Sequence, residues 1–162
     1  MELSRNRFLQ LAGGAIGSLG ISTSSRGEVP NVVGSWKLVS LVTKDVATGK
    51  MESPLGEHPK GYLIYTPEGR MMALLVHEKR SPLVVDEDRI NLHKYMAAYS
   101  GRYTVEGAKV VHHVDISWNE SWTGTDQVRF FELQGDKLTI NAPISSVDGL
   151  ASTSVLVWER ER

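Results

Sequence analysis

Beyond Pro30 the chain consists of short runs rich in β-branched and aromatic residues, separated by glycine, proline, asparagine and aspartate. Alternating apolar and polar side chains over runs of this length are typical of β-strands with one buried face. The runs occupy residues 32–43, 61–66, 70–77, 101–118, 125–140 and 152–160. The fourth and fifth runs each hold two strands around a turn, so the pattern predicts about eight strands at short, regular spacing.

Three breaks between strands have the residues of β-hairpin turns. Pro67-Glu68-Gly69 suits a type I turn closed by a left-handed glycine. Glu106-Gly107 and Gln134-Gly135-Asp136 also place glycine where a tight turn needs it. Hairpins join antiparallel neighbours, and a closed sheet leaves no exposed edge. We therefore expect an all-β fold, an antiparallel barrel of about eight strands.

One segment departs from the strand pattern and predicts a short helix over residues 86–100. Ile90, His93 or Lys94, and the alanine pair at 97 and 98 follow helical spacing. Asp86 or Asp88 is the expected N-cap, and Gly101 can end the helix. A single helix between strands does not make a parallel crossover, so it leaves the predicted antiparallel barrel unchanged.

Residues 1–28 differ in composition from residues 29–162, for which we predict one barrel domain. A cationic head, Ser4–Gln10, precedes an uncharged run of small and apolar residues, Leu11–Ser22, and then a polar tail. This is the layout of an export signal, so we expect a periplasmic or extracellular protein. The alternative is a disordered segment or short helix that remains uncleaved on a cytoplasmic protein.

The cationic head also resembles a twin-arginine signal, whose pattern is Ser-Arg-Arg-x-Phe-Leu-Lys. Ser4, Arg5, Phe8 and Leu9 match, while asparagine replaces the second arginine and glutamine the lysine. The apolar run behind this head is too short and too rich in glycine to span a membrane as a mature helix. We therefore expect no stable membrane span in the mature protein.

Composition narrows the chemistry. The 162 residues are 41% hydrophobic and 23% charged with a net charge of −1, which suits a globular domain and gives no reason to expect nucleic acid as a partner. Cysteine is absent, which excludes thiolate catalysis, disulfides, iron–sulfur clusters and zinc ribbons. Neither a glycine-rich phosphate loop nor a Gly-x-Ser-x-Gly nucleophile motif occurs. We expect no cofactor.

The two ends of the strand pattern carry a resemblance to a known family. The first strand holds Gly34-Ser35-Trp36 and the last holds Trp158-Glu159-Arg160. Lipocalins carry a Gly-x-Trp at this place, and a late arginine commonly packs across that tryptophan. Over residues 33–160 the chain is more closely similar to the bacterial and fungal lipocalin-like domain family. The resemblance implies a small calyx-type barrel; it implies no particular reaction and no catalytic residues.

The adjacent histidines His112 and His113 invite a metal site, but successive side chains of a strand point to opposite faces. A shared mononuclear metal is therefore not expected, and no third ligand is evident on either face. We predict that Asp115 pairs with Gln127 and His113 with Arg129 on the next strand. This register gathers His113, Asp115, Gln127 and Arg129 on a polar face and leaves His112 among valines on the apolar face.

The polar face has two interpretations. It is either the solvated outer wall of the barrel, as in many antiparallel sheets, or part of the calyx lining. The resemblance favours the lining, where Arg129 would bind an anion and His113 would act as acid or base. The candidate catalytic residues are then His113, Arg129 and Tyr103. The candidate ligand-binding residues are Tyr65, Tyr103, His113, Asp115, Gln127 and Arg129.

The sequence is compatible with three functions. The first is binding of a small apolar or amphipathic molecule in the calyx, since an eight-stranded barrel has room for one small ligand. The second is a cofactor-independent isomerase, cyclase or lyase that uses His113 and Arg129. The third is an envelope accessory protein without a ligand. Trp118 and Trp122, in a connection between strands, are expected at the barrel mouth as a lid or as a packed plug.

Overall fold

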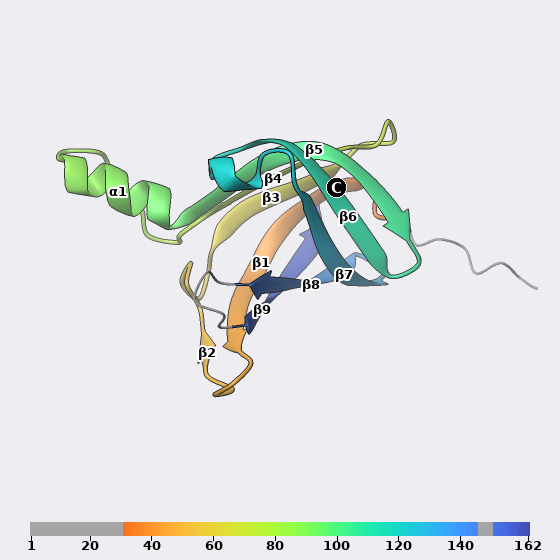
Figure 1. Ribbon diagram of the computed structural model, residues 1–162, viewed down its shortest axis with the longest axis horizontal. Coiled ribbons are helices and arrows are strands. Elements are labelled where there is room, and N and C mark those ends of the chain that lie inside the picture. The colour runs from red at the N-terminus through yellow and green to blue at the C-terminus, as the bar shows by residue number, and fades with distance from the viewer. Residues whose placement is uncertain (1–30, 146–150) are drawn as a thin grey trace, which may run out of the picture.

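The computed structural model describes residues 31–145 and 151–162, and the predicted export leader lies outside these residues. Eight strands form one closed antiparallel barrel in which β1 pairs with both β3 and β9, so the predicted fold class is confirmed (Figure 1). A ninth, two-residue strand, β2, pairs antiparallel with the C-terminal end of β1. The barrel strands are β1 (Gly34–Asp45), β3 (Lys60–Tyr65), β4 (Arg70–Val76), β5 (Met96–Glu106), β6 (Lys109–Ser117), β7 (Asp126–Gln134), β8 (Lys137–Ser145) and β9 (Ala151–Arg160); β2 is Met51–Glu52.

The three predicted hairpins are confirmed. They join β3 to β4, β5 to β6 and β7 to β8, each with antiparallel pairing on both sides of the turn. Gly69, Gly107 and Gly135 adopt φ values of 81°, 60° and 59° in these turns. A side chain at such a φ would crowd the backbone, which is why glycine occurs at these positions.

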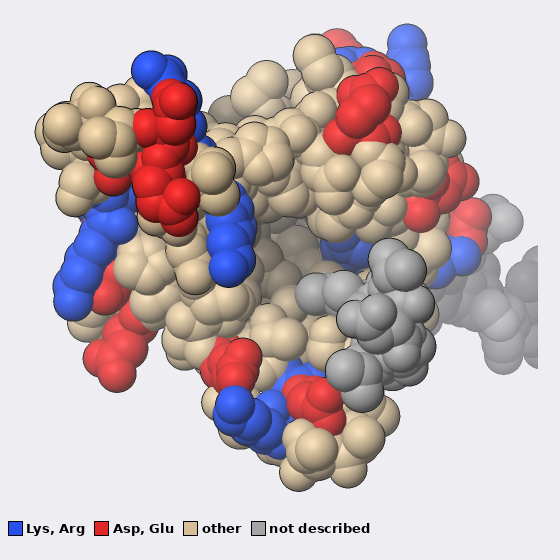
Figure 2. All heavy atoms as spheres, turned by 60° about the vertical axis from the view of Figure 1, so that its left-hand side comes forward, with Lys and Arg blue, Asp and Glu red and all other residues tan. Residues whose placement is uncertain are grey.

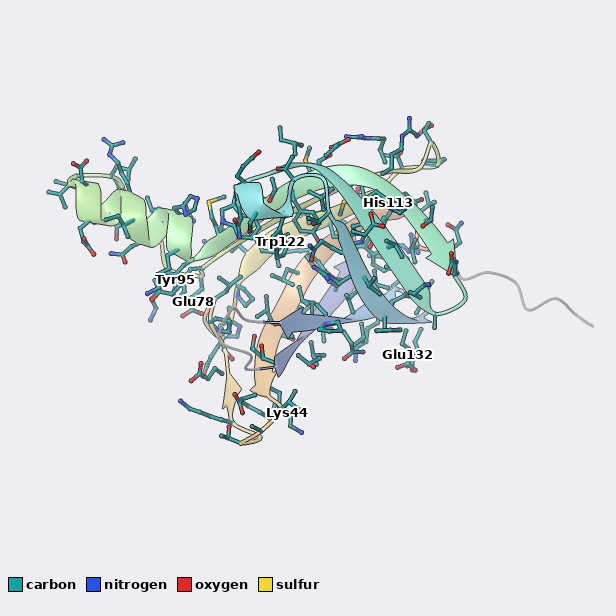
Figure 3. All side chains as sticks on the ribbon, in the orientation of Figure 1. Lys44, Glu78, Tyr95, His113, Trp122 and Glu132 are labelled. Carbon is teal, nitrogen blue, oxygen red and sulfur yellow. The ribbon has the colours of Figure 1, made fainter. Side chains whose placement is uncertain are left out.

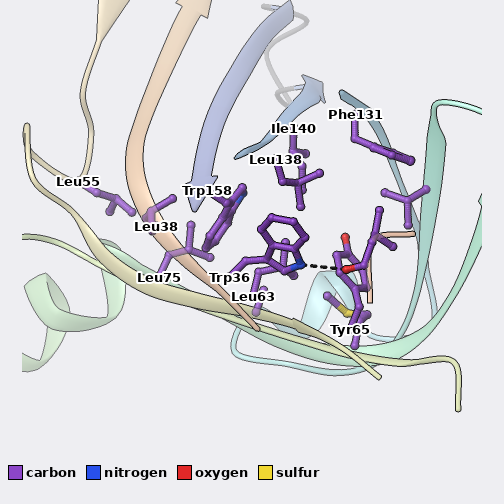
Figure 4. Packing of buried hydrophobic residues seen from close by; sticks show 14 residues of the cluster. Trp36, Leu38, Leu55, Leu63, Tyr65, Leu75, Phe131, Leu138, Ile140 and Trp158 are labelled. Atoms are coloured by element: carbon purple, nitrogen blue, oxygen red, sulfur yellow. Dashed lines mark hydrogen bonds between the residues drawn. The ribbon is translucent and has the colours of Figure 1, made fainter. Parts of the chain in front are cut away.

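The barrel is closed at one end by Trp36 and Arg160, as the resemblance implies. Trp36 is fully buried beside Trp158 and donates from its ring nitrogen to the Val32 carbonyl at 2.9 Å (Figure 4). The Arg160 guanidinium lies 4.1 Å from the Trp36 ring centroid and donates to Val33 at 2.8 Å. Gly34 makes room for it, because a Cβ there would lie only 2.5 Å from the guanidinium.

The predicted helix is correct at its start and wrong at its end. Helix α1 (Asp86–Lys94) stops before β5, and Ala97 and Ala98 pair with β4 instead of continuing the helix. Their strand hydrogen bonds and the burial of Ala97 against the core outweigh their local helix preference. The N-cap is Val85 rather than an aspartate; the Asp88 carboxylate accepts the Val85 N–H at 3.0 Å.

Helix α1 extends away from the barrel and buries none of its residues (Figure 1). A single turn of 3-10 helix, η1 (Glu120–Trp122), lies in the connection from β6 to β7. In the described part of the chain, neither helix has the length and apolar composition needed to cross a membrane.

Candidate functional site

The pairing of β6 with β7 differs from the predicted register. His113 lies opposite Asp126, His112 opposite Gln127, and Val110 opposite Arg129, a shift of three positions. An odd shift exchanges the two faces of a strand relative to its neighbour. Gln127 and Arg129 therefore share the inner face with His112, and the predicted polar face of four residues does not exist.

Two local features accompany the observed register. Ser100 pairs with Ile116 but Gly101 pairs with Val114, so Asp115 is an extra residue that forms a bulge in β6. Beyond the bulge the inward side alternates differently: Val114 is 3% exposed, whereas Ile116 is 64% exposed. The connection from β6 to β7 then ends directly opposite Val114, whose backbone bonds to both Gly124 and Thr125.

His113 and Asp115, two of the predicted site residues, lie on the outer wall. The His113 Nδ1 is 2.7 Å from the Asp126 carboxylate, and its Nε2 is 3.1 Å from the Thr104 hydroxyl. Asp115 is exposed and forms an ion pair with Arg70. The predicted acid–base role of His113 inside the barrel is therefore wrong. Within the described residues, no three His, Asp or Glu side chains gather closely enough to hold a metal ion.

The other predicted residues face inward. Tyr65 and Arg129 are 1% and 7% exposed, and Gln127 is half-buried. Tyr103 is also half-buried: its ring packs edge-on against Tyr65 at 4.7 Å, and its hydroxyl donates to the Thr66 carbonyl at 2.9 Å. Tyr103 is thus a packing residue whose hydroxyl already has a partner.

A hydrogen-bonded chain that the sequence did not predict runs through the inner wall. The Tyr65 hydroxyl lies 2.7 Å from Nε2 of His112, and the Tyr99 hydroxyl lies 3.0 Å from Nδ1 of the same ring. The sequence held one signal for these contacts. His112 is two residues from both Val110 and Val114 and so shares their buried face, where a histidine needs polar partners. The two tyrosines come from β3 and β5, so only the folded barrel brings them to His112.

The number of protons available determines which group donates in each of these two hydrogen bonds. Among the described residues, the Tyr65 hydroxyl has no hydrogen-bond partner other than His112, so it satisfies its buried proton only by donating to Nε2. Nδ1 then carries the ring proton and donates to Tyr99. Burial, followed by the charges of Arg129 and His113, lowers the pKa of His112 to about 3, which keeps the ring neutral near pH 7. The Tyr99 proton is left to donate elsewhere.

Arg129 is a buried cation beside this chain. Its guanidinium donates to the Val128 carbonyl at 2.8 Å and to the Gln127 side-chain oxygen at 3.3 Å, and its Cζ lies 5.8 Å from the Trp122 ring centroid. Burial raises the pKa of Tyr99, and the nearby positive charge of Arg129 opposes that rise. No carboxylate of the described residues lies within 4.0 Å of the Arg129 guanidinium.

Of these groups, Tyr99, Gln127 and Arg129 line a cavity of about 590 Å³ inside the barrel. Its surface is mostly apolar, with one set of polar groups on β5 and β7 and a second, the hydrogen-bonded pair Thr43 and Ser154, on β1 and β9. Figure 2 shows the molecular surface hollowed near the centre of the view, on the side from which α1 extends. The apolar lining includes Leu41, Leu55, Leu75, Met96, Ala97 and Leu156; the polar lining includes Thr43, Tyr99, Gln127, Arg129, Ser154 and Asp126, whose carboxylate is paired with His113.

Two tryptophans of the β6–β7 connection stand at the cavity, as expected for the barrel mouth. Trp118 and Trp122 both line it and pack edge to face with ring centroids 5.1 Å apart. Trp122, the last residue of η1, also packs edge to face against Tyr99 with ring centroids 5.4 Å apart (Figure 3). The pair is packed against the rim, and its rings form part of the cavity wall.

Comparisons with known proteins agree with this architecture. A fungal relative, the 4'-hydroxy-3'-methoxypropiophenone carrier protein ppsC of Aspergillus oryzae, is 31% identical over 85 residues, which cover 46% of this chain and 76% of the relative. The sequence pattern of the family described as lipocalin-like domain matches residues 33–161, nearly the whole described barrel. The chain therefore belongs to the lipocalin-like domain family.

Proposed function

We propose that this protein binds one small amphipathic molecule, with an aromatic or other flat apolar body, inside its barrel. The observation that carries the proposal is the cavity of about 590 Å³ with mostly apolar walls and a few polar groups. Cavities of roughly 300–1,000 Å³ with this division of surface are typical of small-molecule sites. Arg129 and Tyr99 give the cavity a polar end that can orient a ligand.

The relative from Aspergillus oryzae supports the same ligand class. It is named a carrier for 4'-hydroxy-3'-methoxypropiophenone, which is an aromatic ring bearing a ketone, a methoxy group and a phenol. A molecule of that layout has a flat apolar centre and oxygen atoms at its ends. In this chain the apolar body would lie against Leu75, Ala97 and Leu156, with an oxygen directed toward Tyr99 and Arg129.

A pair of neighbouring alanines offers a matched test. Ala97 lines the cavity, whereas Ala98 is the next residue of β5 and pairs with Leu74 on the outer wall. Binding of the neutral fluorescent probe N-phenyl-1-naphthylamine, and its displacement by 4'-hydroxy-3'-methoxypropiophenone, would be measured for wild type, Ala97→Phe and Ala98→Phe. Ala97→Phe fills the cavity and should weaken probe binding about tenfold or more.

Ala98→Phe should leave the affinity within about twofold of wild type, because its side chain points away from the cavity. Equal loss in both variants, or no probe binding to a folded wild-type protein, would contradict the proposed function. Thermal unfolding of each variant checks that a lost signal reflects the cavity and not loss of the fold.

We also propose that residues 1–28 direct export of the protein. The support is the order of charged, apolar and polar segments in the sequence. N-terminal sequencing of the protein from separated cell fractions tests it. A shortened chain outside the cytoplasm is expected, and an intact Met1 in the cytoplasm would refute the leader.

A further inference from the structure

A buried guanidinium without a carboxylate partner is costly, and Arg129 has no such partner among the described residues. The side chain is 7% exposed and sits in the wall of the cavity. Asp126 precedes it by three residues on β7, so its side chain points to the opposite face, where it pairs with His113. Removing a charge from water is repaid only by an opposite charge or by strong hydrogen bonds. The described residues supply Arg129 with hydrogen bonds but no anion.

Arg129 also keeps donors for a ligand. A guanidinium has five N–H groups, and the carbonyl of Val128 and the side chain of Gln127 each accept from one terminal nitrogen. The Trp122 ring lies 5.8 Å from its Cζ and limits how far the group can move. A planar, positively charged donor held in this way suits an oxygen anion.

Tyr99 supplies a second donor next to Arg129. Its hydroxyl oxygen accepts the ring proton of His112, whose other nitrogen is held by Tyr65. The hydroxyl proton of Tyr99 is therefore available to the cavity that the residue lines. His112 and Tyr65 are positioning residues here: they set which way the Tyr99 proton points.

We propose that the cavity selects ligands that carry a negatively charged oxygen, bound between the Arg129 guanidinium and the Tyr99 hydroxyl. The inference rests on the proposed function and names its ligand chemistry. A carboxylate, a sulfonate and an ionised phenol or enol share this chemistry. Such a ligand brings the counter-charge that Arg129 lacks in the described residues.

Two probes with the same ring system separate this inference from simple apolar binding. 8-Anilinonaphthalene-1-sulfonate carries a charged oxygen group, and N-phenyl-1-naphthylamine is the same molecule without it. Arg129→Met should weaken the sulfonate about tenfold while the neutral probe stays within about twofold. Arg102→Met removes an equal charge from the exposed outer wall of β5 and should change neither affinity.

The outcomes are distinct. If the neutral probe binds but Arg129→Met weakens both probes equally, charge selection is wrong and the proposed function stands. If neither probe binds wild type, both are wrong. Tyr99→Phe should weaken the sulfonate about threefold more than the neutral probe, with Tyr95→Phe as the exposed control; equal effects of Tyr99→Phe on both probes would remove Tyr99 from the site.

Unliganded stability provides a second readout. If Arg129 serves a ligand, Arg129→Met should melt at or above the wild-type temperature, because it removes a buried charge that no carboxylate of residues 31–145 and 151–162 balances. Arg129→Gln provides a second, polar replacement. A clear fall in melting temperature for both variants would mark Arg129 as a structural residue and overturn the inference.

Discussion

The hydroxyl of Tyr65 on β3 lies 2.7 Å from Nε2 of His112 on β6, two strands that are not neighbours in the sheet. The contact crosses the barrel interior and joins two side chains that are each 1% exposed. It allows a histidine to occupy a wall otherwise filled by valine, leucine and aromatic side chains. It also leads on to Tyr99 and from there to the cavity.

Removing the Tyr65 hydroxyl should destabilise the protein. Tyr65→Phe leaves a buried ring nitrogen without its donor, which costs about 1–3 kcal/mol in the free energy of unfolding. Urea unfolding at pH 7 measures it. Tyr62→Phe is the matched control, because Tyr62 lies in the same strand on the exposed side and its hydroxyl makes a long hydrogen bond of 3.4 Å to exposed Glu161. A loss no larger than the control's would show that the buried contact adds nothing.

The neutral His112 should make the protein sensitive to acid. The unfolded chain binds a proton at histidine below about pH 6.5, whereas the pKa of His112 in the fold is about 3. The unfolded state therefore takes up the proton first, and the free energy of unfolding falls as pH drops from 6.5 toward 3. The stabilisation is complete above pH 6.5, and its loss has a slope of at most about 1.4 kcal/mol per pH unit.

Unfolding free energies at a series of pH values between 7 and 4 measure this slope. His112→Gln should lack the part of the pH dependence that comes from His112, because glutamine does not titrate. His93→Gln, which changes an exposed histidine on α1, should keep the wild-type slope. Identical slopes for wild type and His112→Gln would mean that His112 is not held neutral by burial.

Arg160 should contribute to closure of the barrel floor. Arg160→Gln removes a cation held 4.1 Å from the Trp36 centroid and a hydrogen bond to Val33, with an expected cost of about 1–3 kcal/mol. Arg162→Gln is the control, since that side chain is mostly exposed and its ion pair with Asp136 is worth about 0–1 kcal/mol. Thermal or urea unfolding of both variants decides whether the two arginines differ as predicted.

The barrel was predictable because its signals are local. Alternation within each strand and the glycines of three turns depend on neighbours in the chain, and the structure confirms them. The contact between Trp36 and Arg160 was implied by the family resemblance and not by spacing. Helix α1 was predicted too long, since the pairing of Ala97 with β4 is a tertiary effect that a local pattern does not contain.

The candidate site was predicted less well because it depends on long-range register. Segregating polar from apolar residues led to the wrong pairing of β6 with β7. The outer wall here carries exposed Val128 and Phe130, while Arg129 and His112 are buried. A bulge at Asp115 and tyrosines from other strands decide this arrangement. Around the histidine pair, the shared face of His112 with its neighbouring valines indicated only that the ring needs polar partners, and not which residues supply them.

The position of a bound ligand tests the calyx most directly. Isotope-filtered NMR of the complex with N-phenyl-1-naphthylamine would report which methyl groups lie within about 5 Å of the probe. Contacts to Ala97 and Leu75, which line the cavity, are predicted. Contacts instead to Ala98 and to Leu74, which is 44% exposed on the outer wall, would contradict binding inside the barrel.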